Sequence, residues 1–428
     1  MRATRRLVPS VLLIGGLVGL GAQARHDAAV PFSAAGPDAS PTIAALRARV
    51  ETGEVGALPT FWEEVQKKGT PLIEPFAGDR RYSLVTFLWR GSEQTHDAVV
   101  VDGVAVAVGG VDPRNSEMTH LGTTDVWYRS YQVRNDARFV YKLSENDSLQ
   151  SFVDPDRKSP KVVADPLNPH LFPTGQSFVE LPEAPAQELV ARSPLRMGEV
   201  RQEVFHSALL NNDRRLWVYT PPGFDATRGE YPLAIVFDGL GYTQWVPVPH
   251  ILDNLIADGR IRPMVAVMVG GAAGDRDTMC TAPFADFVAT ELVPWMRERV
   301  RATRAARRTV IAGSSVGGLT ATCAALRHPE VFGNVLSQSG SYWWAPAGDP
   351  AAEWVKRQMT TAARLPLRFY MEVGLMEISD QLNTNRALHE VLRTRGYDVT
   401  YREFNGNHTY LQWRGSFGSA LEALRPDR

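Results

Sequence analysis

Residues 309–327, TVIAGSSVGGLTATCAALR, decide the fold of the C-terminal half of this 428-residue chain. The first four residues are an apolar run that predicts a buried strand, and residues 317–327 predict a helix. Between them, residues 313–317 (GSSVG) match the G-x-S-x-G pattern, in which a serine lies on a sharp strand-to-helix turn. The pattern predicts Ser315 as a nucleophile, with Ser314 as the weaker candidate.

The same alternation of strands and helices continues on both sides of this turn. Apolar strands are expected at Pro232–Phe237, Met264–Val269, Thr309–Ala312, Asn334–Ser337 and Leu367–Val373, a further strand at Val399–Phe404, and helices at Pro283–Val300, Gly317–Arg327 and Asp380–Arg395. Such strands indicate a mostly parallel, doubly wound sheet covered on both faces. A hairpin of Gln202–Leu210 with Arg214–Pro221 is expected to form an antiparallel edge. Residues 200–428 are therefore expected to form an α/β domain of the α/β-hydrolase type.

A different pattern precedes this domain. Short β-rich runs are expected at Ser83–Trp89, Ala98–Val101, Val126–Val133 and Arg138–Leu143, with turn residues between them. Evenly spaced short strands indicate a β-sandwich, which we expect over residues 61–165. Residues 25–60 are expected to be a polar segment with one short helix, and residues 166–199 a linker.

The first 24 residues have the pattern of a secretion signal. Arginines precede an apolar stretch over residues 7–21, and residues 22–24 (AQA) fit a cleavage site. Cleavage there would make Arg25 the first residue of a periplasmic or secreted protein that is free of the membrane. An uncleaved membrane anchor is the alternative, although the stretch is short for a span of about 20 residues.

The composition limits the class of protein. Hydrophobic residues make up 44% and charged residues 22%, as in ordinary soluble domains. The formal net charge of −1 lacks the basic excess of nucleic-acid-binding proteins. Two cysteines, Cys280 and Cys323, are too few for a Cys-rich zinc site. In an oxidising compartment they could form a disulfide, or stay separate as small buried residues. We expect no metal or other cofactor, and a small molecule as the partner.

A nucleophilic serine needs a base to take its proton. His408 ends the turn Asn405-Gly406-Asn407-His408, directly after the expected strand 399–404. The last strand of the sheet would deliver a base there to the edge that carries the serine. His389, in the middle of a helix, and His328, before a proline, have the pattern of surface residues. His408 is therefore the predicted base.

The acid that orients the base should follow the expected strand 367–373, because the order in α/β-hydrolases is serine, acid, histidine. Glu377 lies in the loop after this strand and is the first choice. Asp380 is the alternative, although it has the position of a helix N-cap. Glu372 lies within the strand. A Ser–His dyad without an acid is the third possibility.

Two backbone N–H groups should stabilise the oxyanion. The residue after the nucleophile, Val316, supplies one of them. The loop Asp238-Gly239-Leu240-Gly241 ends an early strand, and Leu240 is the predicted second donor. A plain strand-end turn is the alternative interpretation of this loop.

Several stretches together resemble the enterochelin esterase family of siderophore hydrolases. They are residues 313–344 (GSSVGGLTATCAALRHPEVFGNVLSQSGSYWW), Asn407-His408 with Trp413-Arg414-Gly415, Val85–Arg90, Gly122–Trp127 and Ala164–Pro169. The resemblance covers the chain from about residue 60 onward. It implies an Ig-like N-terminal domain, an α/β-hydrolase domain, and hydrolysis of the ester backbone of a tri-catecholate siderophore such as enterobactin. Ser315 and His408 match the family's nucleophile and base, and Glu377 matches its acid less closely.

The sequence departs from the family's pattern at one place. Members usually carry an Arg-x-x-Glu-Leu box, and here Arg276 is kept while Met279 stands where the glutamate would be. Arg276 is a candidate cation for an anionic substrate, and Trp343 and Trp344 are candidate aromatic walls for catechol rings. A carbohydrate or feruloyl esterase with a glycan-binding sandwich, and a non-catalytic binding protein on the same fold, are the alternative functions.

Overall fold

The computed structural model describes residues 31–147, 161–227, 229–271 and 280–426. The expected signal (residues 1–24) and Arg276 lie outside the described residues. No helix in the described ranges combines the length and the apolar character that crossing a membrane requires.

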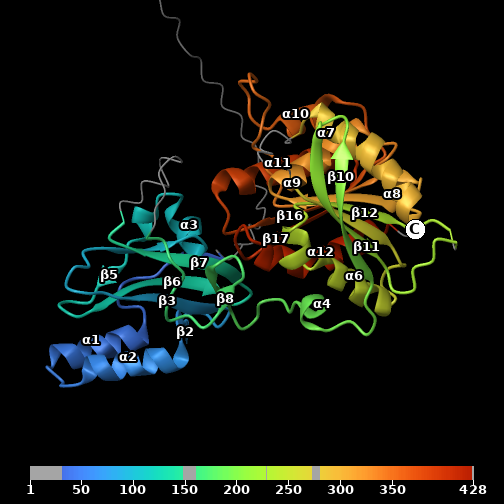
Figure 1. The fold of residues 1–428 in the computed structure, drawn as a ribbon. Helices are drawn as coiled ribbons and strands as arrows, with labels where there is room; N and C mark the ends of the chain where they lie inside the picture. The colour runs from blue at the N-terminus through green and yellow to red at the C-terminus, as the bar shows by residue number, and fades with distance from the viewer. Residues whose placement is uncertain (1–30, 148–160, 228, 272–279, 427–428) are drawn as a thin grey trace, which may run out of the picture. The chain divides into compact units, whose positions relative to one another are not determined.

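A mixed sheet forms the centre of the C-terminal α/β domain (Figure 1). Its strands, in spatial order, are β10 (Glu199–Ser207), β11 (Asn212–Thr220), β13 (Val265–Val269), β12 (Leu233–Phe237), β14 (Thr309–Ser314), β15 (Asn334–Gln338), β16 (Arg368–Gly374) and β17 (Asp398–Phe404). β10, β11 and β13 pair in antiparallel fashion, and all pairs from β13 to β17 are parallel. The predicted doubly wound sheet with an antiparallel edge is confirmed.

Helices cover both faces of this sheet (Figure 1). One face packs against α7 (Ala282–Phe287), α8 (Val293–Val300), α9 (Val316–Arg327), α10 (Trp354–Thr361) and α11 (Ser379–Thr394), and the other against α6 (Val248–Ala257) and α12 (Tyr410–Leu424). The faces alternate along each strand, since successive side chains of a strand point to opposite sides.

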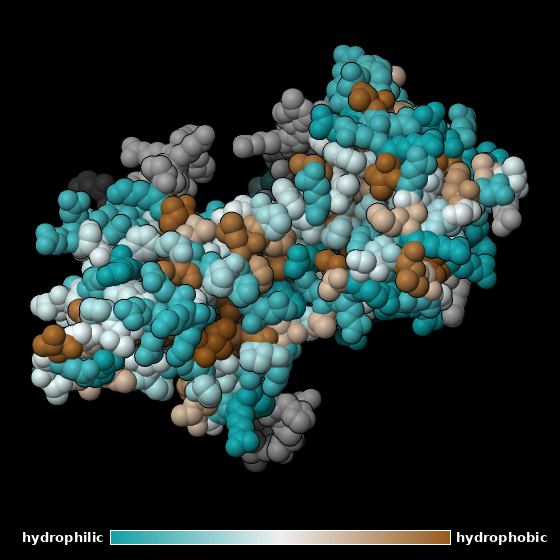
Figure 2. All heavy atoms as spheres, turned by 60° about the horizontal axis from the view of Figure 1, so that its bottom comes forward, coloured by the Kyte–Doolittle hydropathy of each residue, from teal (hydrophilic) through white to brown (hydrophobic). Residues whose placement is uncertain are grey.

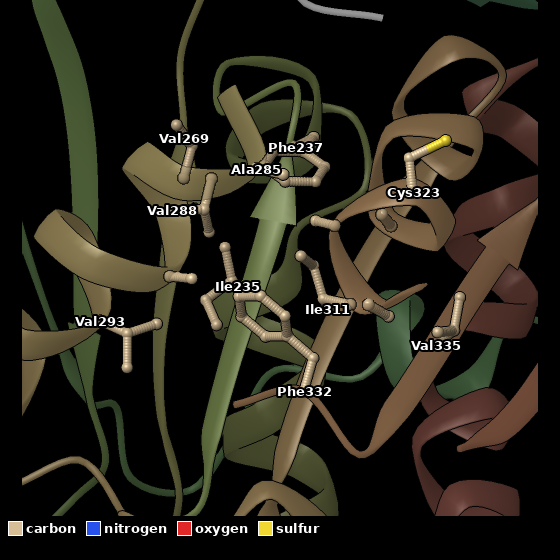
Figure 3. Packing of buried hydrophobic residues seen from close by; sticks show 14 of the residues in the cluster. Ile235, Phe237, Val269, Ala285, Val288, Val293, Ile311, Cys323, Phe332 and Val335 are labelled. Carbon is tan, nitrogen blue, oxygen red and sulfur yellow. The ribbon is translucent and has the colours of Figure 1, made fainter. Parts of the chain in front are cut away.

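The side chains in β12 and β14 illustrate this alternation. Ile235 and Ile311 pack with Val293 and Phe332 on one face (Figure 3). Their neighbours in the sequence, including Val236, face the opposite cluster. Full burial of one such side chain stabilises the fold by about 1.5–3 kcal/mol. The continuous apolar runs of the sequence are therefore explained by burial on both faces.

The N-terminal domain contains two sheets that share one core. The first runs β1 (Phe32–Ala34), β6 (Val126–Arg134), β3 (Tyr82–Arg90) and β2 (Leu72–Pro75), with β5 (Thr119–His120) on β6; the second runs β4 (Ala98–Val101), β7 (Arg138–Glu145), β9 (Gln176–Glu180) and β8 (Leu171–Phe172). Phe87 and Tyr131 from the first sheet pack with Tyr141 and Val179 from the second. This packing is that of the expected β-sandwich.

The structure differs from the sequence-based expectation at both ends of residues 61–165, the range expected for the sandwich. Residues 171–180, inside the expected linker, form β8 and β9, and β9 pairs with β7. Before residue 61, β1 pairs with β6, and α1 (Pro41–Glu51) and α2 (Ala57–Lys68) pack beside the first sheet. Short strands of this kind carry little periodicity, so their pairing depends on tertiary contacts.

The expected helix 283–300 is also divided. A π-helical turn, Val288–Leu292, separates α7 from α8. Pro294 lies in the first turn of α8. Because proline has no backbone N–H, it cannot continue the regular hydrogen-bond ladder across this point.

On one face of the molecule the exposed hydrophobic side chains are scattered. Figure 2 shows them as separate brown spots on a face that is mostly teal and white. Single exposed apolar residues are normal on soluble proteins.

A disulfide links Cys280 and Cys323, across 43 residues of sequence. It joins the chain just before α7 to the middle of α9, which begins directly after Ser315. Of the alternatives that the sequence left open, the structure shows the pair. Cross-linking stabilises a fold mainly by restricting its unfolded chain.

The disulfide is expected to contribute about 2–4 kcal/mol to the free energy of unfolding. A Cys280→Ser, Cys323→Ser double variant should therefore unfold at a lower urea concentration than the wild type. Dithiothreitol should lower the wild-type midpoint and leave that of the double variant unchanged. Equal midpoints for oxidised wild type and double variant would contradict the expectation.

Candidate active site

Ser315 lies on the turn between β14 and α9, with backbone angles φ 55° and ψ −123°. A Cβ atom on Gly313 would lie 2.6 Å from the carbonyl carbon of Gly317, so glycine is needed where the turn closes. Ser314 is buried at the end of β14, whereas Ser315 is partly exposed. A strained turn that presents one serine at the end of a strand is the geometry of a nucleophile elbow.

Glu377 and His408 meet at the same edge of the sheet. Glu377 follows β16 and His408 follows β17, and parallel neighbouring strands end at one edge. His408 Nδ1 lies 2.6 Å from Glu377 Oε2, and the Glu377 side chain is fully buried. Because an ionised carboxylate only accepts hydrogen bonds, Nδ1 carries the hydrogen and Nε2 is left to accept a proton.

Glu377 is held by further hydrogen bonds. Its Oε1 accepts from the Gly374 backbone N–H at 2.8 Å and from the Ser339 hydroxyl at 2.6 Å. Ser339 is itself buried with φ 52°, and it accepts a hydrogen bond from Trp413 Nε1 at 3.2 Å. Sequence analysis did not identify Ser339. Ser339 follows β15 directly, and β15 lies between β14 and β16, the strands that precede Ser315 and Glu377. This position in the sequence could have identified Ser339.

The alternative acid lies elsewhere. Asp380 is exposed in the first turn of α11, and none of its hydrogen bonds within the described residues reaches His408. His328 pairs with Asp286 at 2.7 Å, and His389 stacks on Tyr401. The structure therefore brings Glu377, and not Asp380, to His408.

Ser315 Oγ has one hydrogen-bond partner within the described ranges, Ser341 Oγ at 3.4 Å. Ser315 and His408 line the same two cavities, and His408 packs edge-on against Trp413 with ring centroids 4.8 Å apart. Hydrogen bonds between a nucleophile and its base are often long without substrate and shorten in the reacting complex.

Asn407, next to the predicted base, is tied to the N-terminal domain. Its Oδ1 accepts from the Val140 backbone N–H and its Nδ2 donates to the Val140 carbonyl, both at 3.1 Å. Nδ2 also donates to Asp102 Oδ1 at 3.0 Å. Asn407 is only 1% exposed, so each of these bonds is shielded from water. Strand β7 thus holds the loop that carries His408.

Cavities of about 510 Å³ each lie on two sides of Ser315. The first, here called the sandwich-side cavity, has walls from both domains; it is lined chiefly by Val100, Val101, Val106, Val111, Lys142 and Val162 of the N-terminal domain and by Trp343, Met376 and Ile378 of the α/β domain. The second, here called the hydrolase-side cavity, is lined chiefly by Arg214, Phe237, Asp238, Phe284, Tyr410 and Trp413. An ester bound at Ser315 can therefore extend into both.

The predicted oxyanion donors differ in their surroundings. Val316 begins α9 and lines both cavities, so its N–H belongs to the helix end that favours negative charge. Leu240 is 41% exposed and does not line the hydrolase-side cavity, whereas Asp238 of the same loop does. The role of Leu240 stays a prediction.

The candidate substrate-binding residues also lie in different surroundings. Trp343 lines the sandwich-side cavity, where its Nε1 donates to Gln381 Oε1 at 2.9 Å. Trp344 instead packs against Trp354 and the core, and it does not line that cavity. Arg276 falls outside the described residues.

The hydrogen bond between Glu377 and His408 predicts how activity changes when Glu377 is replaced. Glu377→Gln is expected to lower kcat for ester hydrolysis on the order of 10⁴-fold, because an amide can hold His408 in the wrong tautomer. Asp380→Asn is the matched control and should leave kcat nearly unchanged. A loss below about tenfold in Glu377→Gln would point to Asp380 or to a dyad.

Comparisons with known proteins agree on one family. A family model described as "Putative esterase" matches residues 207–424, and one described as "Enterochelin esterase, N-terminal" matches residues 84–190. An iron(III) enterobactin esterase from Escherichia coli O6:H1 is 32% identical over 362 residues, covering 79% of this chain and 90% of the relative. An iron(III) salmochelin esterase from the same organism is 27% identical, covering 90% of this chain and 97% of the relative.

Solved structures give the same result. A ferric enterobactin esterase from Salmonella typhimurium superposes with a TM-score of 0.72 at 29% identity, covering 86% of this chain and 98% of that chain. An enterobactin esterase from Shigella flexneri, solved in the presence of enterobactin, gives a TM-score of 0.70 at 29% identity, covering 87% of this chain and 98% of that one. The chain therefore belongs to the iron(III) enterobactin esterase family of carboxylic ester hydrolases.

Proposed function

We propose that this protein is a serine esterase that hydrolyses the ester bonds of a catecholate siderophore of the enterobactin type. The observation that carries the proposal is the hydrogen bond between His408 and Glu377 beside Ser315, where the cavities meet. Relatives named enterobactin esterases extend over both domains of the chain, which favours this substrate over feruloyl esters.

The reaction proceeds through an acyl-enzyme. His408 Nε2 takes the proton from the Ser315 hydroxyl as Oγ attacks the ester carbonyl, and Glu377 stabilises the imidazolium that forms. The oxyanion accepts a hydrogen bond from the Val316 N–H at the start of α9. His408 then gives its proton to the departing alcohol, and a water activated by His408 releases the acyl group.

Both sides of the ester need room beside the nucleophile. An enterobactin-type trilactone joins serine units that each carry a catechol ring. The sandwich-side cavity, with its apolar walls, suits an aromatic ring, and the hydrolase-side cavity suits the more polar ester backbone. This division supports a substrate that is bulky on both sides of its scissile bond.

Ser315→Ala should abolish hydrolysis of ferric and iron-free enterobactin, with a loss on the order of 10⁶-fold. Chromatography of the products is the measurement, and release of 2,3-dihydroxybenzoylserine is the expected wild-type result. Ser314→Ala is the matched control, because that side chain is buried at the end of β14. Wild type that cleaves methyl ferulate and leaves enterobactin intact would contradict the proposal.

We infer that the mature protein works in the periplasm or outside the cell. The pattern of residues 1–24 supports export, and the disulfide between Cys280 and Cys323 supports an oxidising compartment. Thiol-reducing conditions in the cytosol would oppose such a bond.

Export predicts that Arg25 is the first residue of the mature chain. Expression in a Gram-negative host, preparation of a periplasmic extract and N-terminal sequencing test this expectation. An intact Met1 in the membrane fraction would show an anchor instead, and an intact Met1 in the cytosol would show that the segment does not direct export.

A further inference from the structure

The sandwich-side cavity carries exposed apolar side chains at its margin. Val111 is 62% exposed, Trp343 40% and Ile378 42%, although each is a large hydrophobic residue. All three line this cavity. Apolar side chains that gather in the open at one concave site mark a place where a ligand binds. The hydrogen bond from Trp343 to Gln381 fixes the orientation of its ring.

Among the described residues that line this cavity, Lys142 is the one lysine or arginine. It lies in β7, is partly buried, and forms no ion pair or hydrogen bond with its side chain to any other residue in the described ranges. Its ammonium group is therefore available to an anionic ligand that enters the cavity.

The other charged groups of the cavity are engaged with the protein. Asp102 accepts hydrogen bonds from the Gly103 N–H and from Asn407, and Glu377 is paired with His408. An anionic ligand would meet these two carboxylates as repulsive neighbours, because charges interact strongly at short range in a partly desolvated site. Lys142 supplies the compensating positive charge.

We propose that the sandwich-side cavity is the subsite for one catecholate ring of the substrate, and that Lys142 makes it selective for the iron-loaded, anionic form. The inference rests on the proposed function and assigns part of the substrate specificity to the N-terminal domain.

The charge of the substrate changes with its metal. Iron(III) binds catechol in its doubly deprotonated form, so a tri-catecholate complex is a trianion, whereas iron-free catechol arms are neutral near pH 7. The Lys142 ammonium therefore attracts the ferric siderophore electrostatically, whereas it has little electrostatic attraction for the neutral, iron-free siderophore. The valines and Trp343 contact the ring faces, which are the same in both forms.

The test compares kcat/KM for ferric and iron-free enterobactin in Lys142→Met. The ratio of the two values should fall about tenfold or more relative to wild type, which is the lower range for a hydrogen bond to a charged group. Lys142→Arg should restore much of the ratio. Lys161→Met is the matched control, since Lys161 is exposed and donates to the Asn146 carbonyl, and it should leave the ratio unchanged.

Ionic strength gives a second measurement. Added NaCl should lower the ferric-to-iron-free ratio in the wild type more than in Lys142→Met, because salt screens the charge that the variant lacks. An equal loss on both substrates, or no loss on either, would overturn the role of Lys142. Failure of the wild type to hydrolyse either substrate would instead overturn the proposed function, so the two failures are distinguishable.

Discussion

The double hydrogen bond between the Asn407 side chain and the Val140 backbone joins the two domains next to His408, the predicted base. Asn407 uses its acceptor and its donor on one residue of β7, and the whole contact is buried. A buried polar group that loses its partner costs about 1–3 kcal/mol, so the contact with the sandwich is one of the restraints on the loop of His408. The N-terminal domain is therefore a structural part of the candidate active site.

Strand β7 also contributes a side chain to the sandwich-side cavity. Lys142 follows Val140 by two residues in β7, so their side chains point to the same face of the sheet. Val140 packs with Leu411 of α12, just beyond His408, and Lys142 faces the cavity that contains Ser315. One strand of the sandwich thus contacts the loop of the predicted base and also carries the lysine of the proposed subsite.

The sequence predicted those parts of the fold that have a local signal. Continuous apolar runs gave the strands of the α/β sheet, and the Gly-rich turn at Ser315 requires a close backbone approach that only glycine allows. Because parallel strands end at one edge, the order of Ser315, Glu377 and His408 also predicted that they gather there. Other parts had no such signal. β8 has two residues, and the buried side chains of β9 are Ser177 and Val179, so neither strand shows a continuous apolar run. Across the domains, nothing near Asn407 indicates Val140 as its partner.

Hydrogen bonds around Glu377 connect the predicted acid to other buried residues of the α/β domain. Ser339 joins Glu377 to Trp413, and Trp413 in turn packs on His408. Further inside, Glu372 accepts from Ser416, Gln338 and Tyr370. Burial raises the pKa of Glu372, although these donors oppose the shift.

This network extends from the core of the α/β domain to the predicted base, and Asn407 extends it into the sandwich. In the low dielectric of the interior each bond restricts its neighbours, so the orientation of His408 is set from two directions. The α/β domain fixes the imidazole through Glu377, and the sandwich fixes its loop through Val140. The position of the predicted base therefore depends on both domains, so the proposed function links the sandwich to turnover as well as to binding.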